Sequence, residues 1–178
     1  MKPILILFAH PVAEKSRVQR SLLRKAASLP NVSIRDLYEL YPDFNIDITA
    51  EKEALSAHEI VLWQHPFYWY SCPALLKQWI DLVLEYGWAY GPGGTALEGK
   101  RITNVVSTGG PEAVYQPEGR NRFTVRQFLA PFDQTAVLCK MTYIEPFLVQ
   151  GTHKLSNDLI LAESERYGEW LKGLSHGQ

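Results

Sequence analysis

Three short segments of the chain carry side chains that could bind a planar, anionic ligand. The first is a loop that begins at His10 and ends at Ser16, where an amphipathic segment starts. Free backbone N–H groups in the first turn of a helix bind phosphate, and the Ser16 hydroxyl and the His10 ring could add hydrogen bonds. Ser16 could equally serve only as a helix cap, and His10 only as a turn residue. Phosphate binding is therefore one of two interpretations of this loop.

The second segment places four aromatic residues in a row, Phe67-Tyr68-Trp69-Tyr70, directly after Pro66. Consecutive side chains of an extended chain point in opposite directions, so these four rings cannot all enter one core. Some of them must face solvent, a ligand or a second subunit. A planar ring system lying against the segment and a dimer interface are both compatible with this pattern.

The third segment, Ser107-Thr108-Gly109-Gly110, combines two hydroxyl groups with two glycines. Glycine allows a close approach of the backbone, and the hydroxyl groups could hydrogen-bond the carbonyl oxygens and ring nitrogens of a heterocycle. Taken alone, the segment is also compatible with a plain turn.

Hydrophobic patterns predict that each of these segments follows a β-strand. Residues 3–9 form a continuous apolar run, which is typical of a strand covered by helices on both faces. Further strands are expected over residues 32–37, 59–64, 101–107 and 142–149. Helices are expected over residues 16–29, 49–55, 73–86, 123–130 and 157–171. Thr49 is expected to cap the second of these helices, and Pro131 to end the fourth.

Strands that alternate with helices predict an α/β fold with a parallel sheet. Five strands fit a three-layer sandwich with the flavodoxin-like strand order 2-1-3-4-5. In this fold, ligands bind beyond the carboxyl ends of the strands, at the switch point between strands one and three. The three segments follow strands one, three and four, so we expect them to converge on one crevice. No linker or internal repeat is evident, and a single domain is expected over residues 1–178.

The composition argues against several classes of function. The chain has 18 Lys and Arg against 19 Asp and Glu, a net charge of −1, whereas nucleic-acid binding proteins carry a basic excess. The five histidines show no paired ligand spacing, so no metal site is expected. Cys72 and Cys139 are expected to be buried thiols rather than a disulfide. No leader and no apolar run of about 20 residues is evident, so a cytoplasmic location is expected.

Ordered blocks along most of the chain resemble the flavodoxin-like NAD(P)H:quinone oxidoreductases. The blocks are Ala9-His10-Pro11 with Ser16, Asp36-Leu37-Tyr38, Tyr41-Pro42-Asp43-Phe44, Gln64-His65-Pro66, Pro73-Ala74-Leu75-Leu76-Lys77 with Trp79, Gly87-Trp88-Ala89-Tyr90-Gly91 and Thr108-Gly109-Gly110. Within this family, Tyr70-Ser71-Cys72-Pro73 and Gly91-Pro92-Gly93-Gly94 are similar to stretches of the small bacterial ancillary subunits of glutathione-gated potassium efflux systems.

The resemblance implies a bound flavin, NAD(P)H as hydride donor, a small quinone as acceptor, and a homodimer with active sites at the subunit interface. FMN is expected rather than FAD because the chain is short and shows no adenine-binding extension. The residues implied to hold the flavin phosphate are His10, Ser16, Val18 and Gln19. Those implied to run along the flavin ring are Pro66, Phe67, Tyr68 and Trp69. Those implied to contact its polar edge are Ser107, Thr108, Gly109 and Gly110.

The resemblance also implies two further site residues. Tyr115 falls on the active-site tyrosine of the family. Mammalian members have a histidine shortly after this tyrosine, and here Asn121-Arg122 occupies that region after a one-residue gap. Arg122 could stabilise an anionic reduced flavin electrostatically, but it cannot relay protons because a guanidinium keeps its proton in proteins.

A second function implied by the resemblance is regulatory. The protein would dock on a potassium efflux antiporter at the inner face of the membrane. It would then be cytoplasmic, and peripheral on the inner membrane through that partner.

Overall fold

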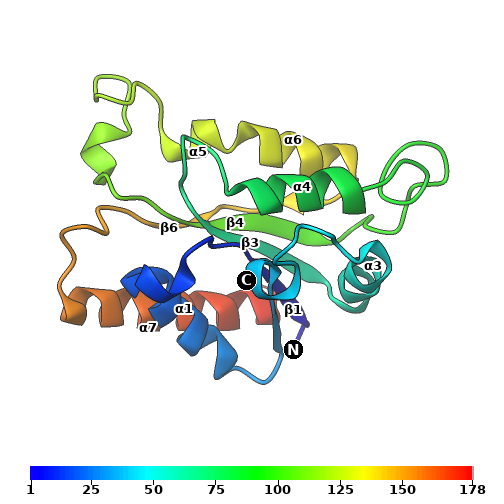
Figure 1. Ribbon diagram of the computed structural model, residues 1–178, viewed down its shortest axis with the longest axis horizontal. Helices are drawn as coiled ribbons and strands as arrows, with labels where there is room; N and C mark the ends of the chain where they lie inside the picture. Colours follow the sequence, from blue (N-terminus) through cyan, green and yellow to red (C-terminus); the bar gives the residue numbers. More distant parts are fainter. Residues whose placement is uncertain (178) are drawn as a thin grey trace.

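A parallel β-sheet lies between two layers of helices in the computed structural model, which describes residues 1–177 (Figure 1). The strands are β1 (Ile4–Phe8), β2 (Val32–Asp36), β3 (Ile60–Pro66), β4 (Arg101–Ser107), β5 (Thr142–Tyr143) and β6 (Phe147–Val149). Their order is β2-β1-β3-β4-β5, and β6 also pairs with β4. The order expected from the sequence is confirmed, with one additional strand.

Helices cover both faces of the sheet. They are α1 (Arg17–Ala27), α2 (Leu37–Leu40), α3 (Ile48–Ala57), α4 (Ala74–Val83), α5 (Val125–Phe128), α6 (Ala130–Leu138) and α7 (Asn157–His176), with 3-10 turns η1 (Ala13–Lys15) and η2 (Glu112–Val114). Helices α1 and α7 lie on one side of the sheet, and α4, α5 and α6 lie on the other (Figure 1). No helix within residues 1–177 is long and apolar enough to cross a lipid bilayer.

Alternate residues of the central strands enter two separate hydrophobic cores. In β1, Ile4, Ile6 and Phe8 pack with residues of α1 and α7. Leu5 and Leu7 pack in the second core, with residues of α4 and α6. All five residues of β1 are buried, as the continuous apolar run predicts for a strand with helices on both faces.

Two of the expected element boundaries are wrong. The last strand, expected over residues 142–149, is divided into β5 and β6, and Pro146 lies between them. Proline has no N–H group to donate to a neighbouring strand, so it interrupts the pairing. Pro131 does not end a helix. It lies in the first turn of α6, where backbone N–H groups have no intrahelical acceptor in any case.

Two side-chain caps also differ from the expectation. Helix α3 begins after Asp47 rather than at Thr49, because Asp47 Oδ1 accepts the N–H of Ala50 at 3.0 Å. The short helix α2, which the sequence did not predict, begins after Asp36, whose carboxylate accepts the N–H groups of Tyr38 and Glu39. Capping of this kind satisfies N–H groups that a helix leaves free at its start.

The carboxyl ends of four strands meet at one edge of the sheet. Phe8 is paired in register with Gln64, Pro66 with Ser107, and Ser107 with Val149. The loops after β1, β3, β4 and β6 therefore leave the sheet side by side. The sequence predicted three of these loops at the site, and the structure adds the fourth.

The two ends of the described chain lie next to each other at the opposite edge. The backbone N–H of Lys2 donates to the carbonyl of Ser175 in the last turn of α7, at 3.1 Å. The first strand starts two residues later, at Ile4, so this contact lies at the amino edge of the sheet (Figure 1).

Candidate functional site

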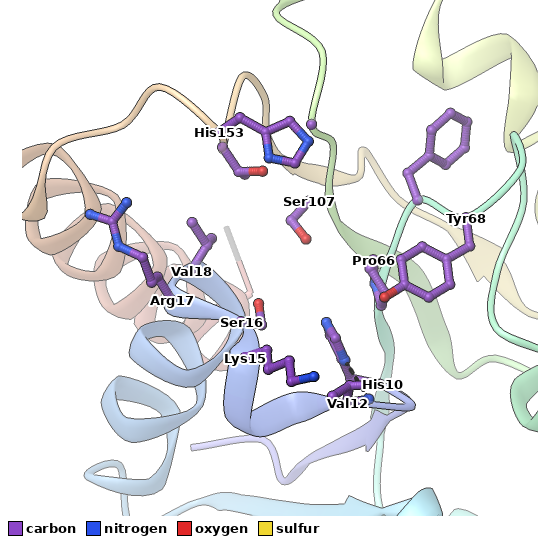
Figure 2. Close-up of a pocket in the computed structure, with 13 residues that line it drawn as sticks. His10, Val12, Lys15, Ser16, Arg17, Val18, Pro66, Tyr68, Ser107 and His153 are labelled. Atoms are coloured by element: carbon purple, nitrogen blue, oxygen red, sulfur yellow. Dashed lines mark hydrogen bonds between the residues drawn. The ribbon is translucent and has the colours of Figure 1, made fainter.

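A cavity of about 740 Å³ opens at the carboxyl edge of the sheet (Figure 2). This volume lies within the range of about 300–1,000 Å³ that is typical of ligand pockets. The cavity is lined by His10, Val12, Lys15, Ser16, Arg17, Val18, Pro66, Phe67, Tyr68, Ser107, Gly109, Thr152 and His153. All three segments singled out in the sequence contribute to this lining.

The N-terminal end of α1 forms one side of the cavity. Ser16 caps the helix, and its Oγ accepts the N–H of Gln19 at 3.2 Å. The N–H groups of Arg17 and Val18 belong to the first turn, which has no intrahelical acceptors. Lys15 and Arg17, which flank Ser16 in the sequence, also line the cavity (Figure 2). The helix dipole and two cations thus favour an anion here.

His10 adds a neutral hydrogen-bond donor. Its Nδ1 accepts the N–H of Val12 at 3.1 Å, so the ring proton of the neutral form is on Nε2. Burial lowers the pKa of His10 below its usual value, against the opposing charge of Glu14. The imidazole is therefore uncharged at neutral pH, and its ring points into the cavity (Figure 2).

The side chain of Gln19, which the resemblance implies to be near the flavin phosphate, lies beneath the cavity. It is fully buried and donates to Ser107 Oγ at 2.8 Å and to the carbonyl of His65 at 3.2 Å. It also accepts a hydrogen bond from Gln64 Nε2 at 2.9 Å. These bonds tie α1 to β3 and β4, and the Gln19 side chain does not line the cavity.

The aromatic segment after β3 divides between two cavities. Pro66, Phe67 and Tyr68 line the large one. Trp69 and Tyr70 have left-handed backbone angles, with φ of 49° and 63°, which is uncommon for aromatic residues. This bend directs both residues to a second cavity of about 180 Å³.

Tyr115 and a cationic loop complete the smaller cavity. Its lining is Phe67, Trp69, Tyr70, Tyr115, Arg120 and Asn121, so Phe67 belongs to both cavities. Burial raises the pKa of the Tyr115 hydroxyl, which stays protonated at neutral pH. Arg122 is exposed and lines neither cavity. Arg120 lines the smaller cavity.

The loop after β4 meets the loop after β6. Gly109 lines the cavity, and a Cβ atom at this position would collide with the ring of His153. Only glycine therefore fits there without a shift of that ring. Thr108 is buried, and its Oγ1 donates to the carbonyl of Gly110 at 2.7 Å, so these two residues shape the turn.

Arg17, Thr152 and His153 line the cavity although they lie outside the three segments that the sequence singled out, and Lys15 lies in the first segment but was given no role. A usable signal existed for Thr152 and His153. The end of the last strand had to align with Ser107, which would have placed the loop that follows Val149 beside the site. The sequence analysis considered only the loops after strands one, three and four, so it left out the loop after the last strand.

A buried chain of hydrogen bonds supports the carbonyl of Pro66. His65 Nδ1 lies 3.0 Å from Pro66 O, and because a carbonyl can only accept, the ring proton is on Nδ1. His65 Nε2 must then accept from Asn104 Nδ2, 3.0 Å away. The Tyr143 hydroxyl in turn donates to Asn104 Oδ1 at 2.6 Å. Burial lowers the pKa of His65 to about 4, so the ring is neutral at neutral pH.

The remaining candidates for chemistry are the thiols and possible metal ligands. Cys72 and Cys139 are both free, and burial raises the pKa of each thiol. Cys139 is buried as expected, whereas Cys72 is only partly so. Within residues 1–177, no group of three or more His, Cys, Asp or Glu side chains is placed to hold a metal ion.

Residues 2–171 match a protein family described by its flavodoxin-like fold. The chain belongs to this family. Two flavodoxin-like relatives are named glutathione-regulated potassium-efflux system ancillary protein KefG. The one from Pectobacterium carotovorum is 47% identical over 168 residues, which cover 94% of this chain and 92% of the relative. The one from Serratia proteamaculans is 44% identical over 175 residues, which cover 98% of this chain and 96% of the relative.

Solved structures that are similar to this chain include the following two. General stress protein 14 from Treponema denticola, in complex with FMN, is 37% identical, with a TM-score of 0.93 and coverage of 97% of this chain and 99% of that one. An NADPH-quinone reductase from P. pentosaceus is 30% identical, with a TM-score of 0.86 and coverage of 94% and 96%.

Proposed function

We propose that this flavodoxin-like protein is an FMN-dependent NAD(P)H:quinone oxidoreductase. The observation that carries the proposal is the large cavity, which has an anion-binding helix terminus on one side and an aromatic and glycine-lined wall on the other. The relatives support it. One neighbour is an FMN complex, which favours FMN over FAD, and another is an NADPH-quinone reductase.

The donors around the cavity fit a flavin phosphate. Lys15 and Arg17 supply positive charge, and the first-turn N–H groups of α1 supply hydrogen bonds. The Ser16 hydroxyl and His10 Nε2–H are further donors, and Val18 closes the apolar side. Gln19 holds the N-terminal end of α1 against β4 through its hydrogen bond to Ser107.

The opposite wall fits the flavin ring. Pro66, Phe67 and Tyr68 offer a flat apolar surface, and Gly109 allows the backbone to approach closely. Ser107 supplies a hydroxyl at this wall, and Thr108 holds Gly110 in the turn beside it.

When bound, FMN supplies the hydride chemistry, taking a hydride from NAD(P)H and passing two electrons to a quinone. The chain contributes orientation, exclusion of water and charge. Tyr115 and Trp69 would wall the substrate side next to Phe67. Arg120 and Arg122 would place positive charge near the reacting end, and neither would move a proton.

We also propose that the active unit is a homodimer. Trp69 is 92% exposed and Tyr70 about half exposed, and both line the smaller cavity. Phe123, also about half exposed, packs against Phe128, which stacks on Tyr70. Large aromatic rings are enriched in interface cores. A second copy seated on these rings would complete the substrate pocket.

A second candidate function is regulatory. The KefG relatives are named as ancillary proteins of a potassium-efflux system, and identity extends over 94% of this chain. We infer that this protein also binds a potassium efflux antiporter at the inner face of the membrane. It would then be cytoplasmic and membrane-associated only through the partner.

Visible absorption of the purified protein, with mass identification of the released flavin, tests the first function. Bound FMN and turnover of NADH or NADPH with a soluble quinone are expected. Failure to bind FMN on reconstitution would exclude the proposal. Co-purification with a potassium antiporter tests the second function independently of turnover.

A further inference from the structure

A second concave surface lies beside the cofactor cavity, between α1 and α7. It encloses about 360 Å³. Its lining residues are Arg17, Arg20, Ser21, Arg24, Asn157, Ile160 and Leu161, and we call it the α1–α7 groove. Arg17 lines both this groove and the larger cavity. Neither the reductase nor the dimer proposed above uses the rest of the groove.

Three guanidinium groups share one face of α1. Arg17, Arg20 and Arg24 are exposed and follow each other at intervals of three and four residues, which places them on one side of a helix. Arg17 donates to Asn157 Oδ1 at 2.7 Å, and Arg20 donates to the carbonyl of Glu14 at 3.1 Å. Both acceptors are uncharged, so these bonds position the side chains without neutralising them.

The positive charge of this face is uncompensated. Within residues 1–177, no carboxylate forms an ion pair with any of the three arginines. The neighbouring Lys25, in contrast, is paired with Glu165. Since the whole chain carries a net charge of −1, the cations of α1 form a local concentration of charge.

The orientation of the two helices adds to this field. Arg17 contacts Asn157, and Ser164 Oγ donates to Ser21 Oγ at 2.7 Å, so α1 and α7 run in the same direction. Their N-terminal ends therefore lie together beside the groove. Each end carries a positive partial charge from its helix dipole.

The groove also has an apolar part. Ile160 lines it, and Leu161 lines it with a side chain that is 59% exposed. An occupant that carried only charge would leave this leucine in water. The lining thus suits a segment in which carboxylates accompany at least one apolar side chain.

We propose that the α1–α7 groove binds an acidic, leucine-containing segment of a partner protein. Guanidinium groups bind carboxylates through two parallel hydrogen bonds, and arginine clusters are a recurring means of recognising acidic motifs. If the partner is a potassium efflux antiporter, that identity rests on the second proposed function. The groove itself follows from the contacts above.

A membrane surface fits this groove less well. Electrostatic binding to anionic lipid uses clusters of about 4–8 Lys and Arg residues. The groove has three, and the chain as a whole is slightly acidic. A recess between two helices also accepts an extended chain more readily than a flat layer of headgroups.

The test measures binding of a short fluorescein-labelled peptide of Glu and Leu to the FMN-loaded protein by fluorescence anisotropy. The variant is Arg20→Glu/Arg24→Glu, which leaves Arg17 and the cofactor cavity unchanged. The matched control is Lys77→Glu/Lys140→Glu, with the same change in charge at α4 and after α6, on the other side of the sheet.

We expect the groove variant to weaken peptide binding by about tenfold or more, and the control to leave it unchanged. Binding should also weaken as salt is raised, because exposed charges are screened. Arg20→Gln/Arg24→Gln should give an intermediate loss. Flavin content and quinone turnover should be equal in all variants, which separates this test from that of the reductase.

Equal peptide affinity in the groove variant and the control would overturn the proposal, as would the absence of peptide binding by the unaltered protein. Co-sedimentation of the same variants with phosphatidylglycerol vesicles tests whether the groove binds lipid instead. If the groove variant lost vesicle binding while peptide binding stayed equal, the groove would be a lipid site and the proposal would be wrong.

Discussion

At the scale of single residues, the site depends on where protons and charges are held. The pKa of His65 is lowered from 6.5 to about 4 because the ring is buried, and both ring nitrogens are occupied in the neutral form. Protonation would give the ring a second donor facing the Asn104 amide, which is already a donor. The neutral ring is thus required for the hydrogen bond that Nε2 accepts from Asn104.

This makes stability dependent on pH in a definite direction. The unfolded chain binds a proton at His65 near pH 6.5, whereas the folded protein resists it until about pH 4. The contribution of His65 to the free energy of unfolding should therefore be fully present above pH 6.5. It should fall by about 3 kcal/mol as the pH drops to 4. Urea unfolding at several pH values measures this. His65→Gln should flatten the slope in that window, and an unchanged slope would show that other groups cause it.

Ser16 tests the phosphate end of the cavity. Ser16→Asp keeps a good helix cap but places a negative charge at the expected phosphate position. FMN binding should weaken by about tenfold or more, about 1.4 kcal/mol, as measured by flavin fluorescence. Ser28→Asp, at the other end of α1, is the control with the same charge. Equal FMN affinity in the two variants would place the phosphate elsewhere.

Arg120 and Arg122 can be separated by the reduction potential of bound FMN. Arg120 lines the cavity that contains Tyr115, and Arg122 does not. Removing a nearby positive charge disfavours electron uptake, so Arg120→Ala should lower the potential and slow reduction by NAD(P)H. Solvent screening at this exposed site limits the effect to about 1 kcal/mol or less. Arg120→Lys should retain part of it. A larger effect from Arg122→Ala would return the role to Arg122.

At the scale of elements, one buried carboxylate joins three parts of the chain. Glu51 of α3 is fully buried, and Arg35 of β2 bonds its Oε1 at 2.6 Å. The Tyr41 hydroxyl donates to the same oxygen at 2.5 Å, and Trp79 Nε1 of α4 donates to Oε2 at 2.8 Å. Every one of these donors would be left without its acceptor if Glu51 were truncated.

Glu51→Ala should therefore reduce the free energy of unfolding by about 3 kcal/mol or more, because Arg35, which is partly buried, and the Tyr41 and Trp79 donors would lose their common acceptor. Glu53→Ala removes an exposed carboxylate from the same helix and should change stability by no more than about 0.5 kcal/mol. Denaturant unfolding of both variants measures the difference. Similar values would mean that the network is not maintained in solution.

How far the sequence predicts these elements depends on which residues carry the signal. The apolar run at Ile4–Phe8 and the positions of the three loops followed from hydrophobic patterns, because helix and strand periods are local properties. Pro131 and Pro146 were misjudged because the effect of a proline depends on whether it starts, ends or interrupts an element. That is decided by tertiary pairing.

The polar interior could not be predicted in this way. Glu51, Gln64 and Asn104 are fully buried, yet such residues are mostly exposed in proteins. Their partners are distant in sequence, so no local pattern marks them. For the site, sequence reasoning placed His10 and Ser16 in the cavity. It missed His153, which reaches the cavity from the loop after β6, a loop that the sequence analysis did not place at the site.

At the scale of the whole molecule, the exposed aromatic rings set the oligomeric state that we propose. Light scattering at micromolar concentration should give twice the chain mass of 20.3 kDa. Trp69→Glu should shift this to the monomer mass, because a charge would then lie in the apolar centre of the interface. A monomer mass for the unaltered, flavin-loaded protein would refute the shared site.

The contact between Lys2 and Ser175 has a practical consequence for engineering. Since the two ends of the described chain meet at the edge of the sheet opposite to the cavity, a tag or a fused domain attached there would lie away from the cavity. Neighbouring termini also permit circular permutation, in which a short linker joins the old ends and an exposed turn is opened. The turn around Gly93, itself exposed, is a suitable place for the new ends.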